Sequence, residues 1–450
     1  MRASQESGSP LWIKILKLGL PILIGQLGMI VVGFADTKMV GLYSTASLAS
    51  ASFVNNLFNT AIFACIGFTY GLTPLVGALF SQKRYGEIGA MVRSGLLVNA
   101  LFTFIPIAVM TVVYFNLHRL GQPEELLPLI RPYFLIYLAG VLPISVFNVF
   151  AQWSYAINRT RMPMWIILAA NVVNIAGNYV LIYGNFGFPE LGLTGAGIAT
   201  LLSRVLCMVA IILVFATGKA YRPYFKGFMS QRASSGTFRR INVTSWPVSL
   251  QMMFESGSFT AAAIMAGWLG AVSLAAFQVI VIIGTLGFCV YYSMAAAVSV
   301  LVANAAGQND CGLMRRTAMS GYRILLILAT CSSALFIFCG PAIMHQFTHD
   351  PAVLSLALTL IVPLVLYQYG DATQICFANA LRGTSNVMPM LWISLVCYVV
   401  VGIPATYLLG FVAEMGSYGI ILSFSVSLFL AAALFLVCFF RTTGRFGAKA

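Results

Sequence analysis

The sequence predicts an all-α membrane protein with twelve transmembrane helices in two six-helix bundles. Apolar residues make up 60% of the 450 residues and charged residues only 8%, a composition that excludes a water-soluble globule. The apolar residues form long continuous runs rather than alternating strands of about 10 residues, so helices are favoured over a β-barrel. In addition, the second half of the chain repeats a pattern found in the first half.

The predicted helices follow from apolar runs that are long enough to cross a bilayer, which takes roughly 20 residues. In chain order, these runs cover residues 15–37, 45–72, 94–116, 128–151, 163–184, 192–217, 242–266, 272–305, 319–340, 352–378, 388–410 and 416–440. The first run is longer than the core of a signal peptide, and no small-residue cleavage site follows it. We therefore expect it to remain as the first membrane helix.

The internal repeat divides the chain into two halves. Residues 21–86 align with residues 247–312 without a gap, at an offset of 226, and Pro21 pairs with Pro247. Because each half has an even number of helices, the two repeats have the same orientation, as in parallel-repeat transporters. The expected parts are an N-lobe of helices 1–6, a basic cytoplasmic linker, and a C-lobe of helices 7–12 with a short cytoplasmic tail, at residues 1–217, 218–241 and 242–450.

The net charge of +14 suggests a polyanion-binding protein until the basic residues are placed on the predicted topology. They fall after the even-numbered helices, at Lys83, Arg84, Arg93, Arg159, Arg161, Lys219, Arg222, Lys226, Arg232, Arg239, Arg240, Arg315, Arg316, Arg323, Arg382, Arg441, Arg445 and Lys449. The positive-inside rule then places both termini in the cytoplasm. The charge is explained by topology, so the expected partner is the lipid bilayer and not nucleic acid.

Three carboxylates interrupt the apolar segments: Asp36, Glu255 and Asp371. An ionisable side chain at membrane depth is costly unless it faces a cavity or a partner, so such residues indicate ion or substrate handling. The acids do not follow the repeat, since Asp36 aligns with Ala262. The scaffold is duplicated while the charges are placed separately in each half, which favours a functional role for them.

Polar and aromatic residues share a helix face with these acids or form stripes of their own. The neighbours of Asp371 are Tyr367, Gln368 and Gln374, and those of Glu255 are Gln251, Met252, Ser258 and Phe259. In the first half, one stripe holds Asn171, Asn174 and Asn178, and another holds Ser52, Asn55, Asn56 and Asn59. Hydrogen bonding between helices is the alternative role for such residues, and we favour it for the serines and Asn56. The expected substrate cavity is lined by Gln251, Met252, Ser258, Phe259, Gln278, Gln374, Asn55 and Asn171.

The chemistry of these groups predicts exchange of one cation for another. A carboxylate removed from water is easier to protonate, and it can instead hold a hard cation such as Na⁺. A lipophilic organic cation is attracted by the same charge and by aromatic faces such as Tyr367, Tyr369 and Phe254. Met252 and Met253 add an adaptable surface. Competition for the carboxylates predicts antiport, with Na⁺ or H⁺ as the coupling ion and no other cofactor.

Several segments together resemble the NorM-like branch of the multidrug and toxic compound extrusion (MATE) family. They are GFADTKMVG in the helix of Pro21, GNFGFPELGLTGAG at 184–197, MMFES around Glu255 and YQYGD around Asp371. The resemblance extends over essentially the whole chain. It implies a V-shaped pair of six-helix bundles that exports cationic, amphipathic drugs in exchange for Na⁺ or H⁺.

The resemblance also implies roles for individual residues. Asp36, Asn174 and Asn178 correspond to the cation site of the N-lobe. Glu255, Tyr367 and Asp371 correspond to the site of the C-lobe, where Na⁺ is an expected ligand. Asn178 stands where some relatives have an acid, which lowers the negative charge of the N-lobe cluster. We expect a monomer in a bacterial inner membrane.

Arg204 is the basic residue deepest within a predicted span. It can pair with an acid, line the cavity or extend to a lipid headgroup. We expect a structural role for it.

Two other functions share some of these features. A MOP-type flippase for lipid-linked oligosaccharide would share the topology, but its anionic pyrophosphate cargo requires several basic residues in the cavity, where this chain offers mainly acids. An intramembrane aspartyl protease would use Asp36 and Asp371 as a dyad. However, the segment QYGD at Asp371 lacks the first glycine of the G-x-G-D signature. No H-E-x-x-H, G-x-S-x-G or P-loop pattern is present, so the sequence predicts a transporter rather than an enzyme.

Overall fold

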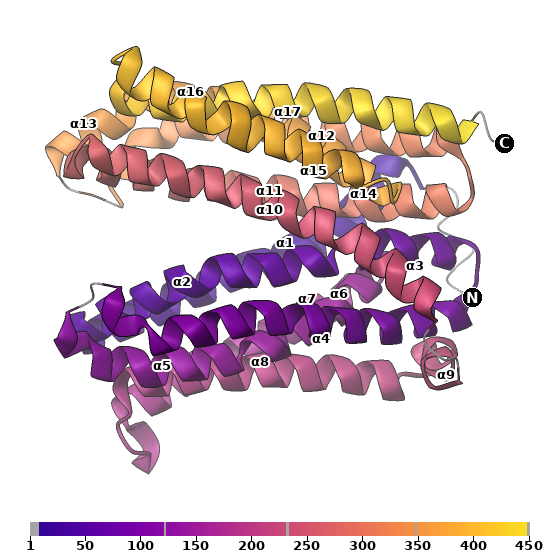
Figure 1. Cartoon of the computed structure of the whole chain (residues 1–450), viewed down its shortest axis with the longest axis horizontal. Coiled ribbons are helices and arrows are strands. Elements are labelled where there is room, and N and C mark those ends of the chain that lie inside the picture. The colour runs from indigo at the N-terminus through magenta and orange to yellow at the C-terminus, as the bar shows by residue number, and fades with distance from the viewer. Residues whose placement is uncertain (1–8, 121–122, 231–233, 347, 349, 448–450) are drawn as a thin grey trace. The chain divides into compact units, whose positions relative to one another are not determined.

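The computed structural model describes residues 9–447, apart from residues 121–122, 231–233, 347 and 349. All regular secondary structure in these residues is helical (Figure 1). The α-helices are α1 (Leu11–Tyr43), α2 (Thr45–Thr69), α3 (Leu72–Ser81), α4 (Tyr85–Phe115), α5 (Leu127–Ala139), α6 (Val141–Ala156), α7 (Arg161–Tyr183), α8 (Gly192–Thr217), α9 (Arg222–Ser230), α10 (Ser235–Trp268), α11 (Ala271–Gly307), α12 (Cys311–Met344), α13 (Pro351–Thr359), α14 (Ile361–Gly383), α15 (Met388–Ser394), α16 (Ile403–Tyr407) and α17 (Gly416–Gly447). Two π-helical segments, η5 (Leu395–Gly402) and η6 (Leu408–Val412), continue α15 and α16. The all-α prediction is confirmed.

Each of the twelve predicted membrane segments coincides with one helix or with consecutive helices. By length and hydropathy, ten helical segments of the described chain can cross a membrane, and the pair α13 and α14, bent by 47°, makes an eleventh. The remaining expected segment, 242–266, which is the seventh in chain order, lies within the 34-residue helix α10. It is less apolar than the other segments because residues 242–266 include Glu255 and many hydroxyl and amide side chains.

The described residues form two compact units. The first unit is residues 24–249, and the second unit comprises the described residues of 1–23 and 250–450. The boundaries lie inside α1 and α10 rather than in the expected linker. The two lobes expected at 1–217 and 242–450 therefore remain a prediction from the internal repeat.

Part of the expected linker is a helix that packs on the first unit. Figure 1 shows α9 beside the ends of α4 and α8, which it contacts. The ring of Trp153 lies 5.7 Å from that of Tyr224 on α9, and the guanidinium of Arg93 donates a hydrogen bond to the carbonyl of Phe228. The helix comes close because Gly227 carries no side chain, and its backbone touches that of Gly86. These contacts make α9 part of the fold.

Gly227→Ala is expected to destabilise the protein by about 1–3 kcal/mol, because the added methyl group overlaps the backbone carbonyl of Gly86, which cannot move away cheaply. Thermal unfolding of the detergent-purified chain measures the effect. Gly236→Ala is the matched control, since the nearest heavy atom to its Cβ, Ser234 Oγ, is at an ordinary 3.5 Å. Equal unfolding temperatures for the two variants would show that α9 is not held by this contact.

Candidate functional site

In the first unit, Asp36 lies at the start of a hydrogen-bonded chain of polar side chains from three helices. Asn178 Nδ2 on α7 donates to Asp36 Oδ1 on α1. The same nitrogen lies 3.3 Å from Asn174 Oδ1, one turn earlier, and Asn174 Nδ2 donates to Thr200 Oγ1 on α8, also at 3.3 Å. Both asparagines are fully buried. The structure thus brings Asp36, Asn174 and Asn178 together, and their role as a cation site stays a prediction.

The other two predicted residues of this unit lie apart from the chain of hydrogen bonds. Asn55 is exposed on α2, and its Oδ1 accepts a hydrogen bond of 3.4 Å from the hydroxyl of Tyr133 on α5. Asn171 is half-buried on α7, with its amide nitrogen next to Gly28 of α1, where a Cβ would lie 2.9 Å away. That nitrogen has no hydrogen-bond partner among the described residues. Both side chains therefore retain capacity for a ligand.

In the second unit, two acids from different helices lie near each other. Glu255 on α10 is half-buried, and its Oε2 accepts a hydrogen bond of 3.2 Å from Gln251 Nε2. Asp371 on α14 is 6% exposed, and its charge interacts unfavourably with that of Glu255. No hydrogen bond or ion pair reaches Asp371 from the described residues. Two nearby negative charges are a site to which a proton or a cation is attracted.

Tyr367 lies one turn before Asp371 on α14 and is buried. Its hydroxyl lies directly against Gly284 of α11, where any Cβ would overlap it. Within the described residues, no three acidic, histidine or cysteine side chains gather into a metal-binding group. A cation held by Glu255 and Asp371 would therefore need neutral oxygen ligands as well, and the Tyr367 hydroxyl is of that type.

The remaining predicted cavity residues differ in their surroundings. Gln374 Nε2 donates to the hydroxyl of Tyr398 at 2.5 Å, and Ser258 Oγ donates to the backbone carbonyl of Glu255 at 2.8 Å. Phe259 packs on Phe424, with ring centroids 4.5 Å apart, as part of the hydrophobic core. Met252 is half-buried on α10, and Gln278 is exposed on α11. Gln374 and Ser258 thus donate their hydrogen bonds to groups within the protein.

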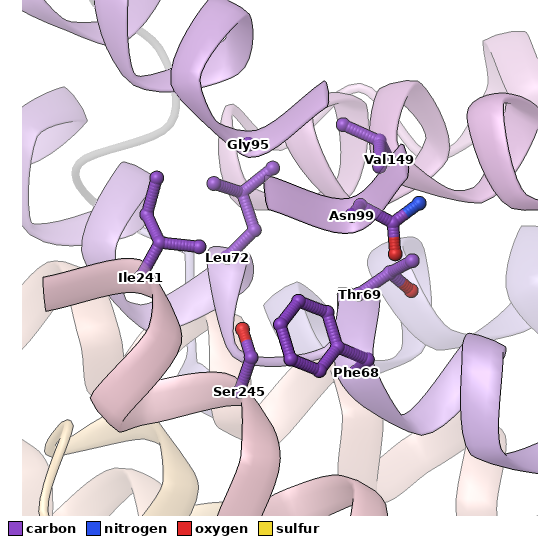
Figure 2. Close-up of a pocket in the computed structure, with 8 residues that line it drawn as sticks. All are labelled: Phe68, Thr69, Leu72, Gly95, Asn99, Val149, Ile241 and Ser245. Atoms are coloured by element: carbon purple, nitrogen blue, oxygen red, sulfur yellow. The ribbon is translucent and has the colours of Figure 1, made fainter. Parts of the chain in front are cut away.

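A small cavity of the first unit contains none of the predicted site residues (Figure 2). Its volume is ≈ 10 Å³, and its lining is Phe68, Thr69, Leu72, Gly95, Asn99, Val149, Ile241 and Ser245. A space of that size corresponds to about one water molecule. It is therefore no drug site.

Comparison with known protein families matches the two halves of the internal repeat. Two segments, residues 21–180 and 247–408, match the model of the MatE family and together cover more than half of the chain. The chain belongs to the MatE family. The matched segments begin 226 residues apart, which is the offset of the internal repeat, so each half of this MatE protein corresponds to one copy of the family unit.

Bacterial relatives match nearly the full length of this MatE protein. The probable multidrug resistance protein NorM of Geobacillus kaustophilus is 27% identical over 409 residues, which are 91% of this chain and 90% of the relative. The protein of the same name from Acinetobacter baylyi is 29% identical over 421 residues, 94% of each chain. The resemblance to the NorM-like branch is confirmed. The chain is a multi-pass membrane transporter and not an enzyme.

Solved structures show that the fold is also that of the family. An outward-facing multidrug resistance MATE family transporter of the MOP superfamily superposes with a TM-score of 0.89 at 18% identity, covering 100% of this chain and 99% of that chain. A MATE structure in complex with MaL6 gives a TM-score of 0.88 at 19% identity and covers 100% of both chains. The predicted MATE-type fold is confirmed.

Two residues near the acids of this MatE protein were missed by sequence reasoning. Arg382 was expected in a cytoplasmic loop, but it is 4% exposed in the last turn of α14, and it donates to Asn379 Oδ1 at 3.1 Å. Its charge acts on Glu255. Tyr398 is fully buried in η5 and lies within electrostatic range of both acids. Neither residue has an acid at helical spacing, so the sequence offered no signal for them.

Proposed function

We propose that this chain exports cationic, amphipathic compounds across a bacterial inner membrane in exchange for Na⁺ or H⁺. The names of its bacterial relatives support drugs as substrates. The observation that carries the proposal is the pair of Glu255 and Asp371, two interacting acids from separate helices of the second unit. We also propose a monomer with both termini in the cytoplasm, in agreement with the distribution of basic residues.

The pair supports antiport because the ionised site attracts both the coupling ion and the drug. When both acids are ionised, their mutual repulsion favours binding of any cation that fits. A proton or Na⁺ relieves that repulsion, and so does the positive group of a drug. Because the ligands compete for the same negative charge, ion entry promotes drug release. Alternating access to the two sides of the membrane then converts the competition into export.

Efflux from reconstituted vesicles tests the proposal. The full-length chain is placed in proteoliposomes loaded with ethidium, and a Na⁺ gradient and a pH gradient are imposed separately. We expect at least one gradient to drive ethidium movement, and the effective gradient identifies the coupling ion. Ethidium movement that is the same in protein-free vesicles, or that ignores both gradients, would refute ion-coupled export.

Gly284→Ala is expected to raise the ion concentration for half-maximal efflux about tenfold, because the new methyl group displaces the hydroxyl of Tyr367, which lies within electrostatic range of Asp371. The same proteoliposome assay measures it over a range of ion concentrations. Gly257→Ala serves as the matched control in the same unit, since nothing lies within 4 Å of its Cβ. Unchanged ion dependence in Gly284→Ala would show that the tyrosine hydroxyl takes no part in ion binding.

A further inference from the structure

Arg204 is a charged side chain in the middle of a membrane helix that the proposed mechanism does not use. It lies at the centre of α8, which runs from Gly192 to Thr217. An unneutralised cation at that depth is costly, so it requires a negative or π-electron partner within the protein. Of the acidic residues in the first unit, Asp36 is the one inside an apolar run predicted from the sequence.

The structure places Arg204 beside the Asp36 cluster. Thr200, which accepts the hydrogen bond from Asn174, is four residues before Arg204 and therefore on the same face of α8. The charges of Asp36 and Arg204 attract each other, and both act on Tyr133 of α5. Arg204 is thus close to the acid, one helical turn from the end of its hydrogen-bonded chain.

Arg204 nevertheless forms no ion pair with Asp36 in the described structure, and two contacts explain why. Its guanidinium carbon lies 4.3 Å from the centroid of the Tyr137 ring, a cation–π arrangement. Its Nη1 packs against Gly140, where a Cβ would lie 2.8 Å away, and this nitrogen has no hydrogen-bond partner among the described residues. Asp36 in turn is occupied by the amide of Asn178. The arginine is held within electrostatic range of the carboxylate but out of contact.

We propose that Arg204 is a tethered counter-cation that sets the cation affinity of the Asp36 site. Its fixed positive charge offsets the negative charge of the Asp36 carboxylate. Any mobile cation at Asp36 therefore binds against the repulsion of the guanidinium. Tyr137 limits this repulsion by holding the guanidinium of Arg204 against its ring. This inference rests on the proposed function and identifies Arg204 as a residue that tunes affinity without touching the ligand.

The proposal predicts opposite effects for Arg204→Met and Tyr137→Leu, with Arg204→Lys as the variant that keeps the charge. Arg204→Met removes the charge while keeping an apolar stem, and it should tighten equilibrium binding of ethidium about tenfold. Arg204→Lys keeps the charge but not the planar guanidinium that stacks on Tyr137, so it should not tighten ethidium binding. Tyr137→Leu frees the arginine to pair with Asp36 and should weaken ethidium binding. A purely structural arginine would instead make Arg204→Met and Tyr137→Leu change affinity in the same direction.

The experiment measures ethidium binding to the detergent-purified full-length variants by fluorescence anisotropy, at fixed pH and Na⁺ concentration. The same Arg204→Met change is also made in an Asp36→Asn background, where its effect should fall below about twofold because the carboxylate charge is gone. Weaker or unchanged binding by Arg204→Met, or an equal gain in the Asp36→Asn background, overturns the proposal. Ion-driven efflux by the natural chain is measured in parallel, so that failure of the proposed function is recognised separately.

Discussion

Asp371→Asn and Glu255→Gln are each expected to lower ion-driven ethidium efflux at least about tenfold in proteoliposomes, while the protein remains folded. Each change removes one of the two charges whose repulsion creates the demand for a cation. The amide side chains have nearly the same shape, and they remove a buried charge rather than adding one, so the fold should tolerate them. Efflux is followed under whichever gradient drives the natural chain.

Asp310→Asn is the matched control for these substitutions. Asp310 caps α12 by accepting a hydrogen bond of 2.8 Å from the backbone N–H of Leu313, and asparagine caps helices equally well. The control should transport like the natural chain. Unimpaired efflux by either Asp371→Asn or Glu255→Gln would show that the substituted acid takes no part in ion coupling.

Binding of ethidium without a gradient distinguishes two ways in which the acids could act. If the carboxylates are shared by ion and drug, Asp371→Asn should weaken ethidium binding and remove its dependence on the competing ion. If they serve the ion alone, ethidium affinity should be retained and only the ion dependence lost. The first result is the one expected, because both acids belong to a single pair.

The Asp36 cluster was predicted in two steps: the residues indicated a buried acid and a polar helix face, and the family resemblance grouped them into one site. Asn174 and Asn178 are four residues apart and must lie on one face of their helix, and an acid in another span needs a polar partner. The structure joins them by hydrogen bonds. Local periodicity and the cost of burial thus marked the individual residues, while the resemblance supplied their grouping.

Other features depend on contacts between distant segments, which one sequence does not display. Arg382 follows an apolar run and was assigned to a loop, but α14 continues to Gly383 and the guanidinium finds acceptors on its own helix and on Tyr292. Tyr398 lies in a π-helical segment, where the period of 3.6 residues used to assign helix faces does not hold. The segment at α9 looked like a linker because its packing depends on glycines far away in the chain.

Asn178→Leu is expected to destabilise the first unit by about 3 kcal/mol and to impair efflux. The substitution deletes the shared donor of Asp36 and Asn174 and leaves two polar groups without their partner in a buried setting. The apparent unfolding temperature in detergent measures the loss. Asn148→Leu is the matched control, because the amide of Asn148 only bonds the carbonyl of Ile144 on its own helix and its loss should cost little.

The double variant Asp36→Asn with Asn178→Leu decides whether the loss comes from the stranded carboxylate. A charged acceptor without a donor is costlier than a neutral one, so the double variant should be more stable than the sum of the two single effects. Strict additivity would mean that Asn178 stabilises the helix packing independently of Asp36. A positive coupling would show instead that α7 holds the acid of α1 in its charged form by hydrogen bonding, so that neutralising Asp36 weakens the attachment between these helices.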